Sequence, residues 1–115
     1  MSATVRSMDA ELITRALRGF TDVHEFALSK DPATSRYSLR LTLANASGQT
    51  KTLRCGDVQN LELNATGEGF ARMPLLRVED VRSEALERIH YTIDELETEG
   101  IFLHCAEIEL IELIA

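Results

Sequence analysis

The sequence predicts a mainly β domain of the α+β class: an antiparallel sheet of six or seven strands, curled or sandwiched, with one N-terminal amphipathic helix. Two observations support this fold class. Apolar residues recur at helical spacing only near the start of the chain, and after Gly19 they alternate with polar residues in short runs separated by turn-forming residues. No second helical crossover follows, so a parallel sheet of βαβ units is not expected.

The first element is expected to be a helix over Met8 to Arg18. Ser7 is the expected N-cap, and Asp9 and Glu11 suit the positive end of the helix dipole. Gly19 then offers a left-handed stop. The apolar positions at helical spacing, which are expected to dock on the sheet, are Met8, Leu12, Ile13, Ala16 and Leu17.

Alternation of apolar and polar residues predicts the strands that follow. The clearest example before the end of the chain is Tyr37 to Leu43, which is followed by turn-forming residues from Asn45 to Gly48. The predicted strands in this region are Val23 to Ser29, Tyr37 to Leu43, Thr50 to Cys55, a continuation through Leu61 and Leu63, and Leu75 to Val81.

The last part of the chain predicts a hairpin between Ile89–Ile93 and Ile101–Ala106. Pairing Ile93 with Ile101 gives a consistent apolar face and places His90 opposite His104 on the other face. Beyond Ala106 the alternation continues until Ile111 changes its parity, for which a bulge and a helical ending both remain open.

The length of 115 residues and the hydrophobic content of 44% fit a single domain over residues 1–115. No apolar run approaches the roughly 18 residues that span a bilayer, so no membrane contact is expected. The first six residues lack the apolar core of a signal peptide, so a cytoplasmic protein is expected. Cys55 and Cys105 are therefore interpreted as buried, reduced thiols.

Charge is divided unequally along the chain. Met1 to Arg54 carries eight cations and five carboxylates, whereas Cys55 to Ala115 carries four and fourteen, and the net charge is −7. This asymmetry indicates an acidic surface and a protein partner, possibly a basic one, and it disfavours nucleic acid. The residues predicted to contact the partner are Asp94, Glu95, Glu97, Glu99, Glu107 and Glu109.

The alternative explanation of these charges is neutralisation within the domain. In that interpretation, cations of the first half lie beside the acidic strands of the second half, and the candidates are Arg36, Arg40, Lys51 and Arg54. The carboxylates from Asp94 to Glu99 also invite a calcium site, but the 12-residue frame with a central glycine is absent. A solvated hairpin tip is the expected arrangement.

His90 and His104 are the candidates for a metal site, with Asp94 as a nearby oxygen donor. Strand-face histidines are more often solvated or packed, so no metal and no cofactor are predicted. No arranged nucleophile and base and no phosphate-binding loop occurs in the sequence, which predicts a protein without enzymatic activity.

Two segments resemble a known group of proteins. Residues 86–93 and 101–108 (LERIHYTI and IFLHCAEI) resemble the C-terminal hairpin of small bacterial all-β proteins, including immunity proteins encoded beside polymorphic toxins, and residues 52–61 (TLRCGDVQNL) are similar to an earlier strand and loop of those proteins. The likeness covers about half of the chain. It implies a protein that binds and blocks a toxin without catalysis.

The functional prediction combines these observations: a cytosolic binding protein, of the toxin-neutralising immunity type, that meets a basic partner through an acidic face. The alternative is a structural or self-assembling β domain in which the apolar end, Ile108 to Ile114, pairs with another copy in a homo-oligomer.

Overall fold

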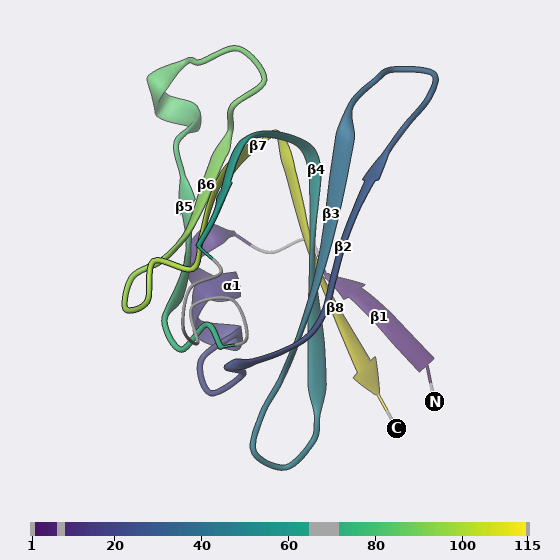
Figure 1. Ribbon diagram of the computed structural model, residues 1–115, viewed down its shortest axis with the longest axis vertical. Coiled ribbons are helices and arrows are strands. Elements are labelled where there is room, and N and C mark those ends of the chain that lie inside the picture. Colours follow the sequence, from purple (N-terminus) through teal and green to yellow (C-terminus); the bar gives the residue numbers. More distant parts are fainter. Residues whose placement is uncertain (1, 7–8, 65–71, 115) are drawn as a thin grey trace.

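The computed structural model describes residues 2–6, 9–64 and 72–114. Seven antiparallel strands, β2 to β8, follow one short helix, and β1 adds an eighth strand at one edge (Figure 1). The predicted fold class is confirmed. The elements are β1 (Ser2–Arg6), α1 (Ala10–Ala16), β2 (Asp22–Lys30), β3 (Tyr37–Ala44), β4 (Thr50–Leu63), β5 (Leu76–Asp80), a 3₁₀ turn (Arg82–Glu84), β6 (Tyr91–Glu95), β7 (Ile101–Cys105) and β8 (Glu107–Ile114).

Strand β4 belongs to both parts of the sheet. Its first half, up to Gly56, pairs with β3 on one side and β8 on the other, and its second half pairs with β7. The strand order is therefore β1-β8-β4-β7-β6-β5, with β3 and β2 joined to the first half of β4. The sheet is neither closed nor strongly curled (Figure 1).

Two residues bend β4 where its partner changes. Asp57 and Asn60 have φ angles of 56° and 54°, a left-handed conformation that Asp and Asn tolerate better than most residues. The bend also changes the parity of the buried positions, because Cys55 and Val58 are both buried although they are three residues apart. The predicted strand Thr50 to Cys55 and its predicted continuation through Leu61 and Leu63 are thus one strand with a bend between them.

The helix is shorter than predicted. It begins at Ala10, and Asp9 is its N-cap, with the side chain accepting a hydrogen bond of 2.9 Å from the Leu12 amide. The prediction of Ser7 as the cap was wrong, and Ser7 and Met8 lie outside the described residues. The helix packs against the core through Ala10, Ile13 and Leu17, and Gly19 follows with a φ of 83°, as expected for a left-handed stop.

The core lies between the helix and the inner face of the sheet. Its residues come from the helix and its C-terminal end, from strands β3 to β8 and from the segment just before β5. The most completely buried are Ile13, Leu39, Leu41, Leu43, Leu53, Met73, Ile93, Ile101, Leu103 and Leu110. Cys55 and Cys105 are free, buried thiols, as the sequence predicted. No helix in the described part of the chain is long and apolar enough to cross a membrane.

The predicted register of the last hairpin was wrong by two residues. Tyr91 lies opposite Cys105 and Ile93 opposite Leu103, so the predicted apolar face is kept. His104, however, lies opposite Thr92, and His90 precedes β6. The end of the chain is strand β8, which pairs with β4 without a register shift, so neither a bulge nor a helical ending occurs there.

Candidate partner-binding surfaces

The predicted contact residues divide between two separate grooves. Asp94, Glu95 and Glu99 line a groove of about 480 Å³ beside the β6–β7 turn, which we call the hairpin groove. Glu107 and Glu109 line a second groove of about 250 Å³ at the bend of β4, which we call the central groove. Glu97 is exposed at the turn and lines neither of them.

Glu95 is a buried structural residue, only 2% exposed, although a solvated tip was expected. Its carboxylate accepts hydrogen bonds from the amides of Leu75 (3.0 Å), Glu97 (2.9 Å) and Thr98, and from the Thr98 hydroxyl. Burial raises the pKa of Glu95, but these hydrogen bonds outweigh it and hold the pKa below its ordinary value. Glu95 therefore fixes the turn through hydrogen bonds within the domain.

The free charge of the hairpin groove comes from two other carboxylates. Asp94 is paired with the Arg77 guanidinium by two hydrogen bonds of 2.8 and 3.1 Å. Glu62 and Glu99 are exposed, and neither forms an ion pair with a described residue. Glu62 was not among the predicted contacts. It joins the groove because the bend of β4 brings it opposite Phe102 on β7.

Apolar side chains border the same groove. Leu63 and Leu96 are 45% and 44% exposed, and Phe102 and Ile101 form part of the lining. A groove that combines exposed leucines with uncompensated carboxylates suits a protein surface of opposite charge, because such interfaces combine an apolar centre with a polar rim.

The central groove is partly neutralised from within, as the alternative interpretation predicted. Glu109 lies 3.6 Å from Arg54, and Arg36 lies 4.0 Å from Asp57. Lys51 likewise lies 3.4 Å from Glu112 on β8. Arg40, the fourth predicted cation, pairs instead with Glu25 of the same half of the chain.

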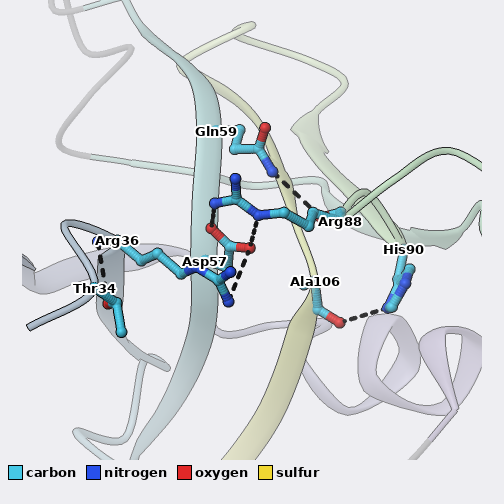
Figure 2. Close-up of polar contacts among 7 residues, drawn as sticks. All are labelled: Thr34, Arg36, Asp57, Gln59, Arg88, His90 and Ala106. Atoms are coloured by element: carbon cyan, nitrogen blue, oxygen red, sulfur yellow. Dashed lines mark hydrogen bonds and ion pairs between the residues drawn. The ribbon is translucent and has the colours of Figure 1, made fainter. Parts of the chain in front are cut away.

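Asp57 is the centre of the polar network beside the central groove (Figure 2). Its side chain is 9% exposed and accepts two hydrogen bonds, of 2.5 and 2.7 Å, from the Arg88 guanidinium. These bonds, together with the charge of Arg36, lower the pKa of Asp57, so it is ionised at neutral pH. Arg36 reaches Asp57 from beside the β2–β3 turn and Arg88 from the connection between β5 and β6.

His90 and His104, the two candidate metal ligands, form hydrogen bonds with different residues. One ring nitrogen of His90 lies 3.0 Å from the Ala106 carbonyl oxygen, and one of His104 lies 2.9 Å from the Asn60 amide nitrogen. Among the described residues, no three His, Cys, Asp or Glu side chains converge as a metal site requires.

Comparison with known proteins places the chain in a family. Residues 12–110 match the family described as Immunity protein PIM8. The chain belongs to this family. The match confirms the resemblance noted in the sequence and extends it over most of the chain, well beyond the C-terminal half. No curated protein and no solved structure gives a significant match.

Membership in an immunity protein family implies a toxin as the protein partner and neutralisation of that toxin as the role, typically without enzymatic activity. Sequence reasoning found most of the groove carboxylates but missed Asp31, Asp57 and Glu62, as well as the arginine that binds Asp57, Arg88. The only signal for Asp57 was its place after Gly56, where a polar residue interrupts the alternation of a strand.

Proposed function

We propose that the chain neutralises a toxin by binding it through the hairpin groove, and that the toxin presents a basic surface there. The observation that carries this proposal is the pair of unneutralised carboxylates, Glu62 and Glu99, beside the exposed Leu63 and Leu96. Opposite charges across an interface speed association and exclude wrong partners, while apolar contacts at its centre supply most of the affinity.

The hairpin groove is favoured over the central groove because of charge compensation. In the central groove, Arg36 and Arg54 lie close to Asp57 and Glu109, so a basic partner would have to displace them. In the hairpin groove, Asp94 is the one carboxylate paired with an arginine among the described residues. Glu107 and Glu109 are therefore secondary contacts in this proposal, and Glu95 acts by holding the turn.

The self-assembling alternative has less support. It requires a free edge at Ile108 to Ile114, but β8 is paired with β4 on one side and with β1 on the other. The proposal keeps the cytoplasmic location expected from the sequence, which suits two free thiols in a reducing compartment.

The test begins by finding the toxin through its activity. Fragments of the host genome are expressed in a bacterium that lacks this chain, and those that arrest growth only in its absence are selected. The dissociation constant between the purified toxin and the chain is then measured at two salt concentrations. Glu62→Lys/Glu99→Lys is expected to weaken binding by about 10- to 100-fold and to reduce its dependence on salt.

Glu25→Lys is the control for each of these two substitutions made singly, because it makes the same charge change as either of them, on β2 and away from the groove. Among the described residues Glu25 forms an ion pair with Arg40 alone, and loss of this exposed pair costs less than about 1 kcal/mol of folding free energy. If the double variant binds the toxin as tightly as the wild type at both salt concentrations, the hairpin groove is not the contact surface.

A further inference from the structure

The connection between β5 and β6 is exposed along its whole middle part. Every residue from Arg82 to Arg88 is exposed, whereas Val81, Ile89 and His90 at its two ends are half-buried. We call residues 81–90 the anchored loop. In Figure 1 it projects beyond the ends of β5 and β6, at the opposite end of β6 from the β6–β7 turn.

Polar contacts fix both ends of this loop. The Val81 amide donates a hydrogen bond of 2.8 Å to the His90 carbonyl, which joins the two ends of the loop. The His90 amide donates a hydrogen bond of 3.0 Å to the Cys105 carbonyl on β7. On the first side, the Arg82 guanidinium binds the Asp80 carboxylate at 2.6 Å and lies over the Tyr91 ring, 5.7 Å from its centroid.

The other side is fixed to the bend of β4 (Figure 2). Arg88 forms its two hydrogen bonds to Asp57, and the Gln59 side-chain amide donates to the Arg88 carbonyl at 3.3 Å. Planar paired bonds between guanidinium and carboxylate fix orientation as well as position. The loop is thus fastened to the part of the sheet that Asp57 itself bends.

The backbone of the loop is held in an uncommon conformation. Ala85 and Arg88 have φ angles of 55° and 61°, and Asp57 at the other end of the ion pair has 56°. Non-glycine residues in this region cost free energy, and they persist where the surrounding contacts impose them. Here the contacts impose this conformation on a loop whose middle side chains are all exposed. Holding the loop in one conformation therefore adds little to the stability of the fold.

Leu86 is the apolar side chain at the centre of this exposed stretch, and it is 47% exposed. Glu84 and Glu87 lie on either side of it, and neither forms an ion pair with a described residue. The two loop arginines are already neutralised by Asp80 and Asp57. The large apolar side chain that the loop exposes is therefore Leu86, flanked by two carboxylates that form no ion pair with a described residue.

We infer that the anchored loop is a second contact element for the toxin, and that Leu86 enters an apolar pocket on the toxin bordered by cations. The inference rests on the proposed function, because the partner is the same protein. A loop ordered before binding loses less conformational entropy in the complex, so the anchors at Asp57 and Arg88 raise affinity without touching the toxin.

The test uses the toxin selected by growth arrest and measures its binding to the full chain. Leu86→Ala is expected to raise the dissociation constant by about 10- to 100-fold, mainly through faster dissociation, with no change in thermal stability. Leu28→Ala is the matched control, since Leu28 on β2 is 43% exposed and loses the same atoms. It is expected to bind as the wild type does.

The anchor is tested separately with Arg88→Lys, which keeps the charge but removes the paired bonds. It is expected to speed hydrogen exchange of the amides of residues 82–88 and to weaken toxin binding by about 3- to 10-fold. Wild-type affinity in both Leu86→Ala and Arg88→Lys, alongside weak binding by Glu62→Lys/Glu99→Lys, overturns this inference and leaves the proposed function intact. Failure of the wild type to bind any selected toxin overturns both.

Discussion

Glu95 is the residue whose role changed most between sequence and structure. In the sequence it is one of four carboxylates around a turn, and its neighbours Glu97 and Glu99 are exposed as expected. What distinguishes Glu95 is its surroundings: three backbone amides and one hydroxyl point at its carboxylate. Backbone donors leave no trace in composition or spacing, so sequence reasoning had no means of separating Glu95 from its neighbours.

Glu95→Gln is expected to lower the free energy of unfolding by about 1.5–3 kcal/mol at pH 7, because hydrogen bonds to a buried charged acceptor are lost. The folded pKa lies below the ordinary value of 4.5, so this stabilisation is fully present above about pH 4.5 and is lost as the pH falls through the folded pKa. Urea unfolding at pH 7 and in this acidic range measures both effects.

Glu97→Gln is the control for that experiment, since Glu97 is exposed on the same turn. On acidification the free energy of unfolding is expected to fall more in the wild type than in Glu95→Gln, so the stability difference between the two proteins becomes smaller. An equal loss in both proteins would show that the charge on Glu95 contributes nothing to folding.

At the level of elements, the positions of strands were predictable and their register was not. Alternation located β2, β3 and β5 to within one or two residues, because each strand packs apolar side chains against the core. A shift of two residues leaves every side chain on the same face, so alternation cannot detect it. This is why the sequence correctly predicted that Tyr91 and Ile93 share the apolar face but wrongly predicted that His90 lies opposite His104.

The contact between α1 and β5 shows how one side chain can complete an edge strand. The Thr14 hydroxyl accepts a hydrogen bond of 2.9 Å from the Val78 amide and lies 3.1 Å from the Val78 carbonyl oxygen. It thereby occupies the place of a neighbouring strand at the centre of β5. Blocking an edge strand in this way prevents pairing with another chain.

Thr14→Val keeps the shape of the side chain but removes this hydroxyl. It is expected to lower the free energy of unfolding by about 1–3 kcal/mol, because the Val78 amide loses its hydrogen-bond acceptor in a part-buried position. Thermal or urea unfolding measures the loss, and Thr14→Ser, which retains the hydroxyl, is expected to lose much less. Equal stability of the valine and serine variants would contradict the role of the hydroxyl.

At the level of the whole molecule, the least predictable features were those that join distant parts of the chain. Asp57 and Arg88 are 31 residues apart, and β1 pairs with β8 across almost the entire sequence. Hydrophobic periodicity describes one element at a time and carries no information on such pairs. The charge asymmetry predicted one acidic face, whereas the predicted contact residues lie in two separate grooves on either side of the bend in β4.

Deleting residues 2–6 is expected to cause self-association, because β8 then presents an unpaired edge next to its buried apolar residues. Sedimentation of the full chain and of the shortened chain at the same concentration measures this effect. The full chain is expected to be monomeric and the shortened chain to form dimers or larger species. A monomeric shortened chain would show that β1 is not needed to protect β8.

The central position of β4 also determines when the sheet can form during synthesis of the chain. Of its partners, only β3 precedes it along the chain, whereas β7 and β8 follow near the end, and β1 must wait for β8. During synthesis, a growing chain therefore holds little more than the β2–β3–β4 meander until translation is nearly finished. Sheets built from such distant pairings fold in roughly milliseconds to seconds. If the chain neutralises a toxin as proposed, a cell is protected only by finished copies made before the encounter.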